Sequence, residues 1–199
     1  MMTNLVANLW PSCGIAGIMA ITASYWGMTL KVSWRSRVLV ACIIVVLSGL
    51  FSWYDGNWTK VDDVYVGLWT VVAYIDWKEQ IIPNRWVIGT LTWRMITMSW
   101  VPPLVASSIA TGLGLLGFYF LVHFVTRGGL GMGDVKFSGS QGMALGWPQG
   151  LLASVIGLWA AGLFSLILLL VFRRSRSQTI ALGPFLVMGG FAGLLGILH

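Results

Sequence analysis

Long apolar runs with almost no charge constrain this chain more than any other feature of its sequence. Residues 104–125 and 151–172 contain no Asp, Glu, Lys or Arg. Each run is long enough to form a helix that crosses hydrocarbon, which takes roughly 20 apolar residues. Charged residues make up only 9% of the chain, against roughly 25% in a soluble domain. We therefore expect an integral membrane protein.

Hydropathy and turn signals predict an all-α, polytopic helix bundle with about eight spans, some of them short or broken. The expected spans are residues 5–30, 38–53, 64–77, 86–101, 104–125, 137–147, 151–172 and 179–198. The third and sixth are short, because a span normally needs at least about 17 residues, and we expect them to stop partway across or to border a wet cleft. The uncharged residues 1–29 are interpreted as a retained first span. No repeat or linker is evident, so residues 1–199 are expected to form a single membrane-embedded domain.

The positions of the basic residues predict the orientation. Alternate threading gathers most Lys and Arg residues on one side, which the positive-inside rule assigns to the cytoplasm. The acidic segment 55–63 and both termini then lie outside. Arg94 falls within the fourth span, where an unpartnered charge is costly. If that segment did not cross, three later basic groups would violate the rule, so we expect it to cross, with Arg94 facing the bundle or a wet cavity.

Several other features point to structure and not to binding sites. Twelve Lys and Arg residues give a net charge of +6, but they are scattered over short loops and form no continuous basic face, which excludes a nucleic-acid partner. Cys13 and Cys42 lie in apolar segments without Cys or His neighbours, so no metal, disulfide or cofactor is expected. Closely spaced glycines are expected to support close helix contacts in lipid. They are Gly112, Gly114 and Gly117 in one group, and Gly189, Gly190, Gly193 and Gly196 in the other.

Two carboxylates, Asp76 and Asp134, are placed where they can do chemistry. Asp76 closes the third expected span, and Asp134 precedes the sixth within Gly131-Met132-Gly133-Asp134. The threading puts both at the cytoplasmic face at the same depth. Gly131 and Gly133 are expected to allow close backbone approach or a positive φ. A simpler reading is that Asp76 ends one helix and Asp134 caps the next.

Two carboxylates that share a poorly solvated site do not both ionise easily, so one keeps a proton. The ionised group can then take a proton from water while the protonated group polarises a peptide carbonyl. The pair therefore indicates an aspartyl peptidase that needs no covalent intermediate.

Three ordered blocks then give the sequence a family resemblance. Asp76 is followed by Ile82-Pro83-Asn84, then by Gly131-Met132-Gly133-Asp134-Val135-Lys136, and near the end by Gly183-Pro184-Phe185-Leu186. Together these resemble the type IV prepilin peptidases, membrane aspartyl proteases of the GxGD class. The resemblance implies that Asp76 and Asp134 are the catalytic pair. Gly131, Gly133, Lys136, Pro83, Asn84 and Pro184 would support the site by positioning, tuning or substrate contact.

The resemblance also implies a biological setting. The enzyme would remove the short basic leader from prepilins or pseudopilins, at the cytoplasmic face of a bacterial inner membrane. Many members of the family carry an amino-terminal loop with paired CxxC motifs and also methylate the new amino terminus. This sequence shows neither that loop nor its cysteines, so it resembles a shorter, peptidase-only form in which methyl transfer is doubtful and zinc is not expected.

Three other readings remain open at this point. Another GxGD intramembrane protease would share the aspartates, although the residues of the Ile82-Pro83-Asn84 and Asp134-Val135-Lys136 blocks favour prepilin cleavage. A transporter also uses membrane carboxylates, but its inverted halves are not seen here. A non-catalytic assembly subunit of a secretion machine is the third.

Overall fold

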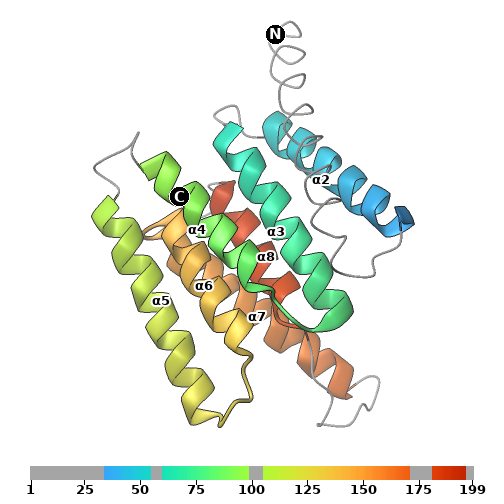
Figure 1. Ribbon diagram of the computed structural model, residues 1–199. Helices are drawn as coiled ribbons and strands as arrows, with labels where there is room; N and C mark the ends of the chain where they lie inside the picture. Colours follow the sequence, from blue (N-terminus) through green and yellow to red (C-terminus); the bar gives the residue numbers. More distant parts are fainter. Residues whose placement is uncertain (1–33, 55–59, 99–104, 171–180, 196–199) are drawn as a thin grey trace, which may run out of the picture. The chain divides into compact units, whose positions relative to one another are not determined.

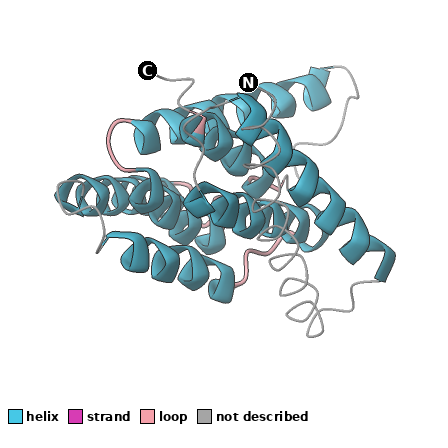
Figure 2. Cartoon of the chain, turned by 90° about the horizontal axis from the view of Figure 1, so that it is seen from above, coloured by secondary structure: helices cyan, strands magenta, loops and turns pink. Residues whose placement is uncertain are grey.

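The computed structural model describes residues 34–54, 60–98, 105–170 and 181–195, and these fold into helices without a strand (Figures 1 and 2). The all-α prediction is confirmed over this part of the chain. The helices are α2 (Trp34–Tyr54), α3 (Lys60–Glu79), α4 (Asn84–Met98), α5 (Val105–Val125), α6 (Met132–Leu145), α7 (Gln149–Leu170) and α8 (Gly183–Leu194).

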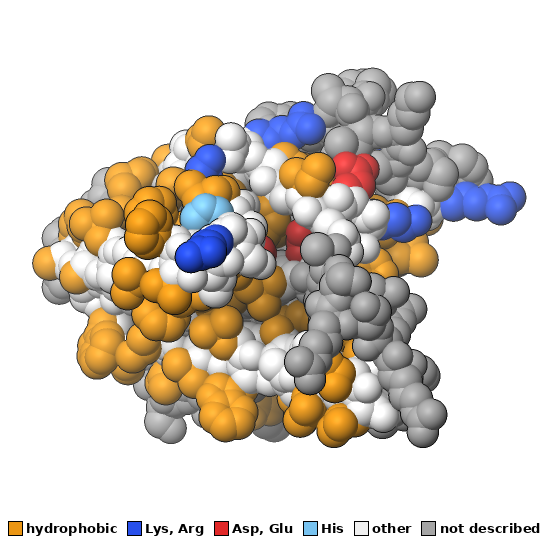
Figure 3. All heavy atoms as spheres, turned by 90° about the horizontal axis from the view of Figure 1, so that it is seen from below, with side chains coloured by type: hydrophobic (Ala, Val, Ile, Leu, Met, Phe, Trp, Pro, Cys, Tyr) orange, Lys and Arg blue, Asp and Glu red, His pale blue; other side chains and the backbone are white. Residues whose placement is uncertain are grey.

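Three of these helices are long and apolar enough to cross a membrane: Arg35–Tyr54 within α2, Val105–Val125 and Gln149–Leu170. Large hydrophobic side chains are exposed along them, including Trp159 at 77%, and hydrophobic atoms cover much of the face in Figure 3. Exposure on this scale suits lipid and not water. The molecule is a helical membrane protein.

The structure does not support a count of about eight spans. The first expected span, residues 5–30, lies outside the described residues. Helices α4, α6 and α8 have 15, 14 and 12 residues, which is short of the roughly 17 that a span needs. The short sixth helix was predicted, whereas the fourth and eighth were expected to be longer.

Helix α3 corrects the prediction for the third span. It has 20 residues and includes Asp62, Asp63 and Glu79, which lie outside the expected span, residues 64–77. Asp62 and Asp63 lie in its first turn and Lys78 in its last, where their charges oppose the helix dipole and extend the helix at both ends. Gln80 then adopts a left-handed conformation with φ of 54°, and the helix ends there.

The chain divides into two compact units, Met1–Val71 and Val72–His199. Helix α3 runs across the boundary, and everything that concerns the candidate site lies in the second unit. The single domain over residues 1–199 stays a prediction.

Helix α6 is the centre of the second unit, since it packs against α4, α5, α7 and α8. Glycines bring the helices together: a Cβ on Gly112 of α5 would lie 2.8 Å from Cβ of Met143, and one on Gly189 of α8 would lie 2.0 Å from the Ala153 carbonyl oxygen. The prediction was wrong for Gly114 and Gly117, because no described atom lies within 4 Å of a Cβ placed there.

Arg94 faces the bundle, as the sequence predicts. Its guanidinium donates a hydrogen bond to Oγ of Ser108, a buried residue of α5. The hydrogen bond gives the charged side chain of Arg94 a polar partner between the two helices.

Candidate active site

Asp76 lies near the carboxyl end of α3 and is only 4% exposed. Its carboxylate bonds to another helix: Oδ2 accepts a hydrogen bond of 2.8 Å from the backbone N–H of Gly183. Gly183 is the first residue of α8, so its N–H has no partner within that helix. Burial raises the pKa of Asp76, and the Gly183 hydrogen bond opposes that shift. The amino end of α8 also carries a partial positive charge, which favours the ionised form of the carboxylate it faces.

Asp134 is the third residue of α6, in the first turn of the helix and not at its cap, which is Gly131. Burial, and next the negative charge of Asp76, raise the pKa of Asp134 to about 7, while the hydrogen bond from Gly131 opposes the shift. Its Oδ1 is buried and has no hydrogen-bond partner in the described structure. Asp134 therefore interacts with the amino end of its own helix, as expected for a residue that only stabilises a helix end. It also experiences the negative charge of Asp76.

The Gly131 and Gly133 backbones do not need a positive φ. Positive φ occurs at Gly128 and Gly146, among the described glycines, and not in the Gly131-Met132-Gly133-Asp134 block. Both positions need space instead: a Cβ on Gly131 would lie 2.9 Å from Oδ2 of Asp134, and one on Gly133 would lie 3.0 Å from Cβ of Ile82. The glycines let the segments around Ile82 and Asp134 touch.

The other expected supporting residues surround this contact. Pro83 lies in the connection between α3 and α4, and Asn84 begins α4. Lys136 is exposed, and its Nζ donates a hydrogen bond to Oδ1 of Asn84 at 3.2 Å. Lys136 thus ties α6 to the start of α4. Pro184 is the second residue of α8, in the first turn, where the missing N–H costs nothing.

The sequence pattern did not predict two polar groups that the structure uses, the Gly183 backbone N–H, which bonds to Asp76, and the Gln141 side chain, which bonds to Leu186 of α8. Gly183 lies in the Gly183-Pro184-Phe185-Leu186 block, and a Gln within an apolar segment is itself a sign of a buried polar contact. The segment before Gly131 is held in addition by His123, whose Nδ1 donates to the Leu130 carbonyl at 2.5 Å. The loop that leads to Asp134 is therefore fixed from α5.

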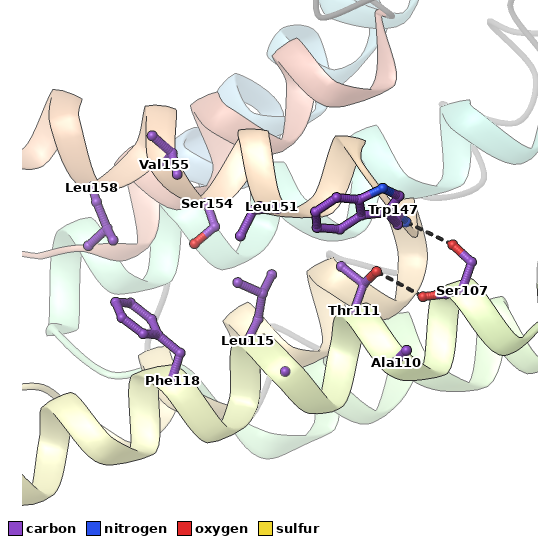
Figure 4. A pocket seen from close by; sticks show the side chains of 11 residues that line it. Ser107, Ala110, Thr111, Leu115, Phe118, Trp147, Leu151, Ser154, Val155 and Leu158 are labelled. Atoms are coloured by element: carbon purple, nitrogen blue, oxygen red, sulfur yellow. Dashed lines mark hydrogen bonds between the residues drawn. The ribbon is translucent and has the colours of Figure 1, made fainter.

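A groove of about 790 Å³ between α5 and α7 lies apart from the aspartates (Figure 4). Its walls are almost entirely apolar, and its polar groups are satisfied internally: Thr111 bonds to the Ser107 carbonyl, Ser107 to the Trp147 N–H, and Ser154 to Tyr119. Neither Asp76 nor Asp134 lines the groove. The candidate chemistry belongs to the junction of α3, α6 and α8.

Comparisons with known proteins confirm the family resemblance. Residues 64–168 match the model of the type IV leader peptidase family. The chain is 30% identical over 176 residues to a prepilin leader peptidase/N-methyltransferase of Dickeya chrysanthemi, covering 82% of this chain and 60% of that protein. A protein of the same description from Legionella pneumophila is 26% identical, with 78% and 57% covered, and one from Pseudomonas putida is 26% identical, with 94% and 67% covered.

The chain thus spans about three fifths of the length of the Dickeya and Legionella relatives. No solved structure matches it closely enough to count as related. The family match covers both Asp76 and Asp134 and more than half of the chain, residues 64–168 of 199. The chain belongs to the type IV leader peptidase family.

Proposed function

We propose that this protein is an aspartic endopeptidase that removes the basic leader from prepilins or pseudopilins, with Asp76 and Asp134 as its catalytic pair. The observation that carries the proposal is that the negative charge of Asp76, on α3, acts on the carboxyl group of Asp134, on α6. Burial and the charge of Asp76 raise the pKa of Asp134 to about 7, so this carboxyl group is suited to hold a proton near neutral pH. A pair that holds one proton is the arrangement that water-mediated peptide hydrolysis requires.

The environments of the two carboxylates suggest their roles. Asp76 accepts the Gly183 N–H at the amino end of α8, which favours its ionised form and suits it to act as the base. Asp134 would hold the proton. Asp76 takes a proton from water, the oxygen of that water bonds to the scissile carbonyl carbon, and Asp134 protonates the carbonyl oxygen. The C–N bond then breaks, the leaving nitrogen receives the proton that Asp76 had taken, and a hydroxyl of the tetrahedral intermediate returns its proton to Asp134 as the new carboxyl group forms.

The setting proposed for this reaction is the cytoplasmic face of a bacterial inner membrane. The basic residues expected on that side include Lys78, Arg85, Arg127 and Lys136, and they flank the segments that carry the aspartates. A helical substrate would enter from lipid and present its leader to the site. The curated relatives are named prepilin leader peptidases, which supports a prepilin as the substrate class.

The proposal is tested by co-expressing the protein with a prepilin and following leader removal by mass spectrometry of the pilin. Cleavage at the junction between the basic leader and the hydrophobic helix is expected. An intact prepilin beside a folded, membrane-inserted protein would refute the proposed activity. The same mass measurement reports whether the new amino terminus is methylated, which we do not expect.

The rate of cleavage is expected to depend on pH through Asp134. Since the pKa of this carboxyl is raised to about 7, the acid is present below that pH and is lost above it. The initial rate at saturating substrate should therefore fall as the pH rises past about 7, approaching a tenfold loss per pH unit. A rate that stays constant up to about pH 9 would show that Asp134 is not the acid.

Gly183→Ala is expected to lower the cleavage rate by about 10-fold to 100-fold. The added Cβ would lie 2.7 Å from Oδ2 and 3.0 Å from Cβ of Asp76, so the carboxylate must move. Gly117→Ala is the matched control, because no described atom lies within 4 Å of the added Cβ. Both variants are compared with the parent in detergent at equal folded concentration. Parental activity in Gly183→Ala would mean that the position of Asp76 does not matter.

A further inference from the structure

Gln141 is a buried polar side chain that the proposed reaction does not use. It lies in α6, is 1% exposed, and its Nε2 donates a hydrogen bond of 2.8 Å to the backbone carbonyl of Leu186. Leu186 belongs to the first turn of α8. The bond therefore joins the helix that carries Asp134 to the helix that holds Asp76.

The spacing of these residues places the bond in line with the two carboxylates. Gln141 follows Asp134 by seven residues, about two turns of a helix, so both side chains lie on one face of α6. Leu186 follows Gly183 by three residues, about one turn, and Gly183 donates to Asp76. Helix α8 is thus anchored at two successive points, first to Asp76 of α3 and then to Gln141 of α6.

Neighbouring contacts of α6 do not fix its position along α8 as well as this bond does. Gly193 of α8 lies against the Leu145 side chain of α6, and a contact between apolar atoms lacks the preferred direction of a hydrogen bond. A buried amide is different, because sliding the helices would leave its N–H groups without a partner in a medium of low polarity. The hydrogen bond therefore selects one register between α6 and α8.

We propose that Gln141 is a positioning residue that sets the separation of the Asp76 and Asp134 carboxylates by fixing α6 against the first turn of α8. This inference rests on the proposed peptidase function for its kinetic consequence, but its structural part stands on the bond itself. A misplacement of about 1 Å between catalytic groups costs about 100-fold in rate. The residue acts through the aspartates and touches neither.

The kinetic test compares two variants with one control. Gln141→Met keeps the length of the side chain but removes the donor, and Gln141→Asn keeps the amide on a stem too short to reach Leu186. Ser140→Ala is the control, since Ser140 is equally buried but its hydroxyl donates to Phe137 of its own helix at 2.8 Å. With a purified prepilin in detergent, kcat should fall about 10-fold to 100-fold in both variants, while KM and the control stay within about twofold of the parent. A parental kcat in both Gln141 variants would overturn the proposal.

A second measurement does not depend on activity. Hydrogen exchange of the amides in residues 183–190 should be faster in Gln141→Met than in the parent, because the first turn of α8 has lost one of its two anchors, and unchanged in Ser140→Ala. Equal exchange in Gln141→Met and the parent would overturn the inference. If the parent cleaves no prepilin, the proposed function fails, and the exchange result still decides whether Gln141 fixes α8.

Discussion

Replacing either aspartate by asparagine is expected to lower the rate of leader removal by about 1,000-fold or more, because each substitution removes one half of the acid and base pair. Asparagine has nearly the same shape as aspartate, and in Asp76→Asn the new side-chain carbonyl oxygen can still accept the Gly183 N–H. The loss should therefore appear in kcat, with membrane levels unchanged. Cleavage is followed as the ratio of mature pilin to prepilin over time.

Glu79→Gln is the matched control for these variants. Glu79 is the last residue of α3, less than one turn beyond Asp76, and its side chain is exposed. Its neutralisation changes the local charge by the same amount without entering the site. Near-parental cleavage in either aspartate variant would remove that residue from the catalytic pair, and a loss of cleavage accompanied by loss of the protein would favour a structural role.

The same substitution at Asp134 should also stabilise the protein, in a pH-dependent manner. The pKa of Asp134 is about 7 in the folded state, against 3.8 for an unperturbed carboxyl. The folded state therefore holds the proton more tightly, so the stability of the parent falls as the pH rises through this window, and the loss is complete above about pH 7. Asp134→Asn should raise the unfolding temperature in detergent at about pH 8, and the gain should shrink towards about pH 4. An unfolding temperature below that of the parent at the higher pH would contradict the burial of an ionising group there.

Gly189→Ala is expected to be the most damaging small substitution in the helix packing. The added Cβ would lie 2.0 Å from the Ala153 carbonyl oxygen and 2.9 Å from the Gly157 nitrogen, both backbone atoms of α7. Neither backbone atom can move without separating α7 from α8. Overpacking of this kind lowers the free energy of unfolding by about 3 kcal/mol. The measurement is the unfolding temperature together with the yield of monodisperse protein after extraction.

Gly162→Ala, on α7, controls for the change from glycine to alanine, because a Cβ there meets no described atom within 4 Å. It should leave the yield unchanged or improve it slightly, through the better helix propensity of alanine. Since α8 supplies the Gly183 N–H to Asp76, any folded fraction of Gly189→Ala should also cleave slowly. Equal stability of the two variants would show that α7 and α8 do not pack through Gly189.

Some features of the candidate site follow from the sequence and others do not. The choice of Asp76 and Asp134 as candidates and the presence of a short sixth helix follow from charge position and hydropathy, which are local properties, although this helix begins earlier than expected and includes Asp134. The partner of Asp76 was not predictable in this way, because Gly183 lies 107 residues away and contributes a backbone N–H that any residue except proline possesses. Lys136 was expected to support the site, and its bond to Asn84 became visible only once α4 and α6 were placed side by side.

Glycines illustrate the same limit. Gly112 and Gly114 belong to the same group of closely spaced glycines in the sequence, yet Gly112 contacts α6 and Gly114 meets no described atom within 4 Å. The reason is that residues two apart on a helix point in very different directions. The length of α3 was underestimated for a related reason. Charged residues at its two ends are typical of loops in a sequence, but in the structure they stabilise the helix termini.

By itself, the sequence determined that this protein is helical, that it belongs in a membrane, and which two carboxylates are the candidates for its chemistry. These conclusions depend on the length of apolar runs and on the positions of the few charges, which are local properties of the sequence. Only the tertiary structure decided that Asp76 is held by the amino end of α8, that Gln141 bonds the same helix to α6, and that glycines near the aspartates provide space and not unusual backbone angles. These are relations between segments far apart in the chain, and hydrogen-bond geometry and close packing define them only after the helices have come together.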